Sequence, residues 1–437
     1  METLRKYPLS VAIMLVIANM IGTGVFTSLG YQVGPLPSGF VILLLWLVGG
    51  VVALSGAFTY AEIATTLKRS GGEYLYLSQI FHPALGFLGG WMSAVVGFAG
   101  AISAVAIAIG AYATEALGVS TQLIAVSAIV LVSGIHWFGV KTGGVAQTIL
   151  TSIKLGLIIF FCIAPFFVSG TRLSHTNFLP QSGDWNLILS PGFAVSLVFV
   201  VYAYTGWNAS AYIAGNLENP KRNLPLSLII GTLIVVVIYL LLNAMFMYSA
   251  TFTELDGQND IGNVVAYKLF GKKAGIVFSG IFSVALLSTL SAMTIAGPRV
   301  TEAMGNDYGL LKSFSKKNKY DMPYLAILVQ GAWSIFLVLV SSFKEIIQYI
   351  SVSLSIFSML TVIGIFWLRK QHPKADAYKV PFYPITPLIF IGCTLWMIYY
   401  VAADDPKILI YSLATLIPGF ILYLLATRYT HKHSSLL

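Results

Sequence analysis

Long apolar runs, each about the length of a bilayer crossing, recur from one end of this chain to the other. A membrane-spanning helix needs roughly 20 mainly apolar residues. The runs are continuously apolar rather than alternating, which argues against a transmembrane β-barrel. Only 9% of the 437 residues are charged, whereas soluble domains carry roughly 25%. The sequence therefore predicts an all-α polytopic membrane protein.

The hydropathy pattern predicts about twelve transmembrane helices. The connections between them are too short for a soluble domain, so residues 1–437 are expected to form a single transmembrane domain. The first run continues into a full span without an A-x-A-like cleavage site, as expected of a span rather than a signal peptide. The predicted spans are residues 8–33, 38–65, 83–116, 121–140, 145–169, 190–216, 224–249, 272–303, 322–341, 344–368, 383–402 and 406–428.

The distribution of Lys and Arg predicts the orientation. If the N-terminus faces the cytoplasm, about 18 basic residues fall on that side and about six on the other, in agreement with the positive-inside rule. Both termini are then cytoplasmic. The net charge of +9 is spread over membrane loops, so it favours contact with anionic lipid headgroups and argues against a nucleic-acid partner.

Two spans are interrupted by glycine near their middle. The first contains "ANMIGTGVFTSLG" (residues 18–30), and the sixth contains "YTGWN" (residues 204–208). Interrupted segments at corresponding places in two halves indicate a transporter binding site. The interval of five spans predicts two inverted five-helix repeats, residues 8–169 and 190–368, with additional helices at 383–428. The alternative is that these glycines only allow close helix packing.

A broken helix exposes N–H groups at the start of one half and C=O groups at the end of the other. These ends carry opposite partial charges, which match the two charges of an amino acid. The carboxylate is expected on the N–H groups of Thr23, Gly24 and Val25. The ammonium is expected on carbonyl groups of the two breaks, namely those of Met20, Ile21, Tyr202, Ala203 and Thr205.

Four stretches resemble the amino acid–polyamine–organocation (APC) superfamily. "NMIGTGVF" is similar to its span 1 signature, and "YAEIATTLKRSGGEYLYL" (residues 60–77) to span 2 and the following loop. "YAYTGWNASAYIAGNLENPKRNLPLSL" (residues 202–228) resembles span 6 of the L-type amino acid transporter (LAT) branch. "LSTLSAMTIAGPRVTEAMGNDYGLL" (residues 287–311) resembles span 8. The resemblance extends over nearly the whole chain.

This resemblance implies the LeuT-like five-plus-five inverted repeat and amino acid transport by alternating access. It implies that Gly22, Thr23 and Gly24 bind the substrate backbone, while Tyr202, Thr205 and Gly206 line the opposite side. Trp207 is then expected to gate the site or to contact the substrate side chain. Many relatives have Gly or Asp where this chain has Thr205, so the side-chain pocket is expected to differ.

The cysteines also set this chain apart from animal members of the branch. Those proteins are linked to a single-span glycoprotein through a cysteine between spans 3 and 4, and this loop ("ALGVSTQ") has none. Cys162 and Cys393 both lie within predicted spans. We therefore expect no disulfide-linked heavy subunit, and a bacterial protein acting alone in the plasma membrane.

Lys154 places an amine inside span 5. Charges within a membrane are expensive and are functional by default, although a lysine near a helix end also snorkels to the surface. In sodium-independent members of the superfamily, a lysine in span 5 occupies the volume of a sodium site. The resemblance implies the same for Lys154, with its ammonium linking the span 1 break to the hydroxyls of Ser288 and Ser291 in span 8.

The remaining polar residues suggest little chemistry. Glu62 is expected either in an intracellular gate or at the headgroups, and Arg299 is expected to pair with Glu302 one turn away. The histidines form no metal-ligand motif and no nucleotide fingerprint is present, so no metal or other cofactor is predicted. An enzyme would need a compact set of titratable groups, so an intramembrane enzyme and a non-transporting amino acid sensor are only remote alternatives.

The two breaks contain no acidic side chain, although Asn208 lies at the second. A site for arginine or a polyamine would ordinarily place a carboxylate near the distal amine. The sequence therefore favours a neutral amino acid as the substrate. Together with the resemblance, this implies a sodium-independent exchanger or facilitator of neutral L-amino acids. A proton-coupled symporter of amino acids or polyamines on the same fold is the alternative. The sequence does not separate small from large neutral substrates.

Overall fold

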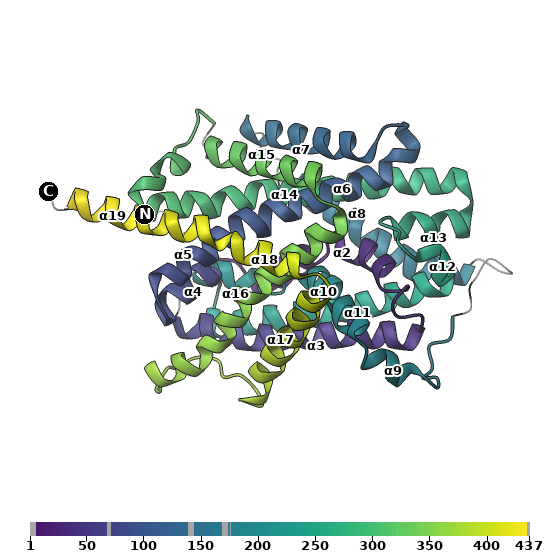
Figure 1. The fold of residues 1–437 in the computed structure, drawn as a ribbon, viewed down its shortest axis with the longest axis horizontal. Coiled ribbons are helices and arrows are strands. Elements are labelled where there is room, and N and C mark those ends of the chain that lie inside the picture. The colour runs from purple at the N-terminus through teal and green to yellow at the C-terminus, as the bar shows by residue number, and fades with distance from the viewer. Residues whose placement is uncertain are drawn as a thin grey trace.

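The computed structural model describes residues 6–67, 71–138, 144–167, 174, 176–320 and 322–434. Helices follow all twelve predicted spans, mostly along one common direction (Figure 1). Their bounds are α1 (Leu9–Met20) with α2 (Gly24–Thr27) and η1 (Ser28–Tyr31), α3 (Gly39–Leu67), α5 (Pro83–Met92) with η2 (Ser93–Phe98) and α6 (Ala99–Leu117), α7 (Thr121–Trp137), α8 (Gly144–Ile163) with η3 (Ala164–Phe167), α10 (Pro191–Tyr204) with η4 (Ala209–Asn216), α11 (Pro220–Ser249), α14 (Lys272–Asp307), α15 (Tyr324–Val340), α16 (Phe343–Gln371), α17 (Ile385–Asp404), and α18 (Pro406–Ala414) with α19 (Leu416–Ser434).

Nine helical segments of the described chain are long and apolar enough to cross a membrane, and α7, α15 and residues 152–167 are shorter apolar helices. The all-α polytopic membrane fold is therefore confirmed. The predicted repeat boundaries stay a prediction.

The connections contain short helices that the hydropathy pattern did not predict. These are α4 (Gly72–Ile80), α9 (Asp184–Ile188), α12 (Phe252–Leu255), α13 (Ile261–Phe270) and η5 (Gly309–Ser315). Figure 1 shows α4 and both chain ends at the left of the view, and α9, α12 and α13 at the right.

Local sequence explains several helix ends. Ser190 caps α10 by accepting a hydrogen bond from the Phe193 N–H, with Pro191 in the first turn, and both residue types favour helix starts. Ser342 and Glu345 form a capping box at the start of α16. Gly118 ends α6 in the left-handed conformation, which glycine adopts without steric cost.

The helices pack in two groups. In one, α11 lies against α1 and α3, and in the other, α6, α7, α14 and α15 pack on one another. Figure 1 shows α7, α15 and α14 at the top of the view and α3, α11 and α17 at the bottom. The broken first and sixth spans contact each other where α2 packs against α10. The breaks therefore lie inside the bundle, where irregular backbone is tolerated.

Candidate functional site

The first break lies between α1 and α2. Ile21 is extended, and the helix resumes only at Gly24. A Cβ added to Gly24 would lie 2.5 Å from the Cα of Ala203, whereas one on Gly22 would meet only a Thr289 methyl group at 4.0 Å. Gly24 is therefore required for the close approach of spans 1 and 6. Gly22 is not required for packing, because a side chain at that position would have room.

The second break follows Tyr204. Thr205 leaves the helical region, and Gly206 has a φ of +103°. A Cβ on Gly206 would also lie 2.8 Å from the main-chain carbon of Asn19. Only glycine meets both conditions without strain. Close packing is thus one requirement at Gly24 and Gly206, and also at Gly30, where a Cβ would lie 2.1 Å from the Gln258 carbonyl oxygen. The role of Gly24 and Gly206 in binding stays a prediction.

The two breaks touch through side chains. The hydroxyls of Thr23 and Tyr202 are 2.9 Å apart. The Tyr239 hydroxyl, from the middle of α11, lies 2.6 Å from the Met20 carbonyl oxygen and 3.1 Å from that of Ala203. The single O–H group of Tyr239 is therefore shared between a carbonyl group of each half-helix, with the shorter contact to Met20.

Sequence reasoning missed Tyr239. The sequence signal was a tyrosine inside the apolar run "VVVIYLLLN" (residues 235–243), because a hydroxyl at membrane depth needs a partner.

The contacts of Tyr239 also alter the site expected for the substrate ammonium. The carbonyls of Met20 and Ala203 accept from Tyr239, and the Tyr202 carbonyl accepts from the Thr205 N–H at 3.0 Å. Each carbonyl retains a second lone pair for a ligand.

Lys154 is buried, with 2% of its surface exposed. Its Nζ donates to the Ile21 carbonyl oxygen at 3.3 Å and to the Thr289 Oγ1 at 3.0 Å. These contacts tie α8 to the first break and to α14. Burial and inward hydrogen bonds argue against the snorkelling interpretation, because a snorkelling amine lies in the headgroup region.

The structure corrects the expected partners of Lys154 in α14. Ser288 donates instead to the Ala285 carbonyl of its own helix at 2.8 Å, and Ser291 is 2.8 Å from His136 of α7. Successive helical residues point in directions about 100° apart. Thr289, between the two serines, therefore faces Lys154 while they face elsewhere.

Trp207 packs into the wall of the second break. Its ring lies 4.7 Å from the Tyr60 ring and 6.0 Å from the Phe390 ring, between α3 and α17. Thr205 is exposed and donates to the Val201 carbonyl at 3.2 Å. The gating role of Trp207 and the contribution of Thr205 to the pocket stay predictions.

A buried carboxylate reaches the second break from α4. The Oε1 atom of Glu73 accepts hydrogen bonds from Tyr60 at 2.6 Å and Ser358 at 2.7 Å, and Asn208 lies 3.5 Å away. Burial raises the pKa of Glu73, which lies outside the spans, while the bonds from Tyr60 and Ser358 oppose this shift. Sequence reasoning missed this group because residues 72–80 were predicted to lie in the loop that follows span 2.

Aromatic residues pack against one another on the η1 side of the first break. The Tyr31 ring stacks on Phe199 with centroids 4.9 Å apart and lies 6.2 Å from Phe343. The Gly257 N–H also donates to the Gly30 carbonyl at 2.8 Å. On the α1 side, the polar side chain of Asn19 is exposed. Aromatic rings therefore pack beside the breaks on the η1 side, and Asn19 is an exposed polar residue on the α1 side.

Glu62 is buried in an ion pair rather than placed among headgroups. Arg369 of α16 binds both carboxylate oxygens, at 2.9 and 2.7 Å, and the Val380 N–H adds a bond at 2.7 Å. This pair joins α3 to α16. Arg299 pairs with Glu302 at 2.9 Å, which confirms that prediction.

The described part of the chain contains no cluster of three or more His, Cys, Asp or Glu side chains able to hold a metal ion. Cys162 lies in α8 and Cys393 in α17, and both are free thiols.

Comparisons of the sequence with known proteins identify the family and several similar proteins. The sequence profile described as "Amino acid permease" matches residues 9–423. The chain is 29% identical to the serine/threonine exchanger SteT of Bacillus subtilis (strain 168), over 90% of each protein. It is 26% identical to the b(0,+)-type amino acid transporter 1 of Mus musculus, over 95% of this chain and 87% of that one. It is 25% identical to the cystine/glutamate transporter of Homo sapiens, over 92% and 81%.

Proposed function

This chain belongs to the amino acid permease family of the APC superfamily, and on that premise we propose that it is a sodium-independent exchanger of neutral L-amino acids. The family and the similar proteins are transporters, not enzymes. Amino acid transport is thus the general activity, and neutral specificity and exchange are the proposal. The name of the serine/threonine exchanger supports both.

The substrate is proposed to bind between the two breaks. The observation that carries this proposal is the contact of the breaks through Thr23 and Tyr202, 2.9 Å apart. Such a site offers N–H groups to a carboxylate and C=O groups to an ammonium. The proposed binding residues are Met20, Ile21, Gly22, Thr23, Gly24, Val25, Tyr202, Ala203, Thr205, Gly206, Trp207 and Asn208.

Sodium independence is proposed to follow from Lys154. Its ammonium lies between the Ile21 carbonyl and the Thr289 hydroxyl, oxygen groups of the kind that coordinate a hard cation. A fixed positive charge there would take the place of the ion. It would also link the position of α1 to α14.

Neutral specificity is supported by the absence of acidic residues at positions 20–25 and 202–208. The carboxylate that reaches Asn208, that of Glu73, already accepts hydrogen bonds from Tyr60 and Ser358. A cationic substrate side chain would have to compete with these donors.

Glu73 also favours a second candidate, proton-coupled transport. Its carboxylate is buried, and its hydrogen bonds come from neutral donors on α3 and α16. A carboxyl group in such a site binds a proton more readily than one in water.

We further propose the five-plus-five inverted repeat, location in a bacterial plasma membrane with both termini cytoplasmic, and function without a disulfide-linked subunit.

The deciding experiment is uptake of labelled alanine, serine and leucine into proteoliposomes without sodium and without a pH gradient. Vesicles loaded with unlabelled amino acid are compared with empty vesicles. Strong stimulation by internal substrate is the expected result. Uptake that appears only with an imposed proton gradient would select the symporter, and uptake that requires sodium would contradict the role of Lys154.

A further inference from the structure

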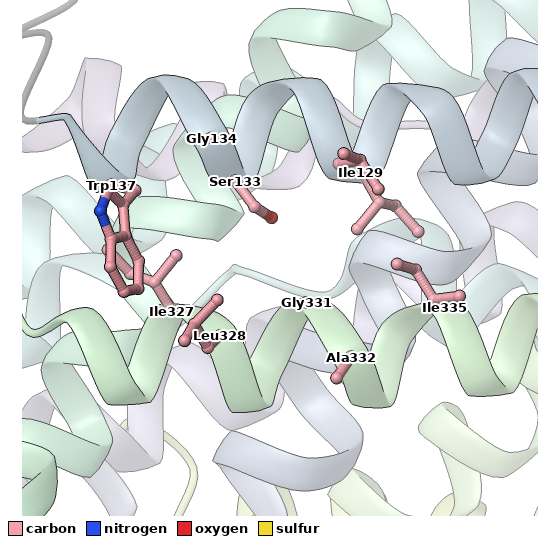
Figure 2. Close-up of a pocket in the computed structure, with 10 residues that line it drawn as sticks. Ile129, Ser133, Gly134, Trp137, Ile327, Leu328, Gly331, Ala332 and Ile335 are labelled. Atoms are coloured by element: carbon pink, nitrogen blue, oxygen red, sulfur yellow. The ribbon is translucent and has the colours of Figure 1, made fainter.

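An apolar groove runs along the outside of the bundle between α7 and α15. It encloses about 350 Å³, within the range of small-molecule sites. Figure 2 shows Trp137 at one end, Ile129 and Ile335 at the other, and Ser133 pointing toward Gly331 between them. Between Ile129 and Trp137, α7 rises roughly 12 Å. The groove is thus long, narrow and apolar, as an acyl chain is.

Small residues create this groove. A Cβ added to Gly134 would meet nothing within 4 Å, whereas one on Gly331 would lie 3.1 Å from the Ser133 hydroxyl. The rim residues Val130 and Leu328 are 56% and 50% exposed, so the groove opens to the surroundings of the two helices. In a membrane protein these surroundings are lipid.

A basic loop is fixed at the Trp137 end. The Asn318 side chain donates to the Trp137 carbonyl oxygen at 2.7 Å. Lys316 and Lys319, on either side of Asn318, are exposed, and the Lys319 ammonium lies 5.0 Å from the Tyr320 ring centroid. Trp137 also packs on Tyr324 with ring centroids 5.6 Å apart. Aromatic rings and lysines together are typical of the headgroup level of a bilayer.

We infer that one anionic phospholipid binds here, with an acyl chain in the groove between α7 and α15 and its phosphate beside Lys316 and Lys319. The apolar groove alone would accept any lipid tail. The adjoining lysines select a negatively charged headgroup, as basic pockets between membrane helices do. This site is separate from the two breaks, so it does not depend on the proposed transport activity.

The test is native mass spectrometry of the purified full chain in detergent, with phosphatidylglycerol or phosphatidylcholine of matched acyl chains added. Gly134→Leu fills the groove, and the double variant Lys316→Gln, Lys319→Gln removes the charges. Gly392→Leu on α17 is the matched control, because a Cβ there also meets nothing within 4 Å. All variants are first checked for wild-type size and thermal unfolding.

We expect one phosphatidylglycerol retained by the wild type and by Gly392→Leu, and little by Gly134→Leu. Each lysine removed should weaken binding by about fivefold. Equal retention by Gly134→Leu and the wild type would overturn the inference, as would equal binding of phosphatidylcholine. A second copy of the chain retained in place of lipid would assign the groove to an oligomer contact and likewise overturn it.

Discussion

The ammonium of Lys154 lies 3.3 Å from the carbonyl oxygen of Ile21, the residue at which α1 ends. A buried cation thus binds the exposed carbonyl end of a half-helix, which carries partial negative charge. The same ammonium reaches Thr289 on α14. Movement of α1 relative to α14 must therefore break or reshape these bonds.

Replacing Lys154 with Ala is expected to reduce exchange at least about tenfold, because hydrogen bonds to charged groups contribute about 1.5–3 kcal/mol. Thr289→Val, which removes one of the two bonds, should have a smaller effect. Counterflow in proteoliposomes measures both. Lys407→Ala, at an exposed position at the start of α18, is the control. Full transport by Lys154→Ala would contradict the proposed role.

Tyr239→Phe should weaken substrate binding and stability together. It leaves two buried carbonyls, those of Met20 and Ala203, without their donor, at a cost of about 1–3 kcal/mol. Tyr204→Phe is the matched control, because the Tyr204 hydroxyl is equally buried but binds the Trp46 carbonyl of α3 at 3.2 Å. The unfolding temperature should fall for both variants, whereas the KM for amino acid transport should change only for Tyr239→Phe. If the KM changed equally in Tyr239→Phe and Tyr204→Phe, Tyr239 would act on the site only through packing.

The two glycines of the first break should respond differently to alanine. Gly24→Ala forces a Cβ to within 2.5 Å of the Ala203 backbone, and overpacking of this kind costs about 1–3 kcal/mol. Gly22→Ala meets open space, so we expect a folded protein with weaker substrate binding. Unfolding temperature and binding of alanine, measured on both variants, test this contrast. If both variants lowered the unfolding temperature equally, the steric contact with Ala203 would not explain the effect at Gly24.

Glu73→Gln should change how stability depends on pH. Since burial raises the pKa of Glu73, the folded protein holds this proton where the unfolded chain has released it. Stability is therefore highest below the ordinary carboxyl pKa and falls as pH rises through the raised value. The neutral amide should flatten this fall when unfolding temperature is measured across pH. A wild-type profile retained by Glu73→Gln would assign the pH dependence to another group.

The ion pair of Glu62 and Arg369 should matter for stability far more than the pair of Lys221 and Asp376. Glu62 is 1% exposed, and without Arg369 its remaining cation is the more exposed Lys379 at 3.5 Å. Removing one partner of a buried pair costs up to about 3–5 kcal/mol. Both residues of the second pair are exposed, and such pairs contribute about 0–1 kcal/mol. Arg369→Gln and Lys221→Gln, compared by thermal unfolding, measure the difference. Equal effects would contradict the buried assignment of Glu62.

The fold and the two broken spans could be predicted because their signals are local. Apolar runs predicted the spans, and the glycines near residues 22 and 206 predicted the two breaks. The apolar run around Lys154 left snorkelling open as an alternative, and the inward position was implied by the family resemblance. The short helices α4 and α13 were missed because they lie in connections where hydropathy gives no clear period.

The sequence by itself determined the membrane fold and the two broken spans, since hydrophobicity and glycine content act within one segment. Burial of the Lys154 amine was decided by the structure. Only the tertiary structure decided which groups meet there. Ser288, Thr289 and Ser291 are similar hydroxyls in the sequence, and the rotation of α14 alone directs Thr289 to Lys154. Tyr239 reaches Met20 across 219 positions of the chain. Such partners depend on how separate helices approach and turn, which no local pattern records.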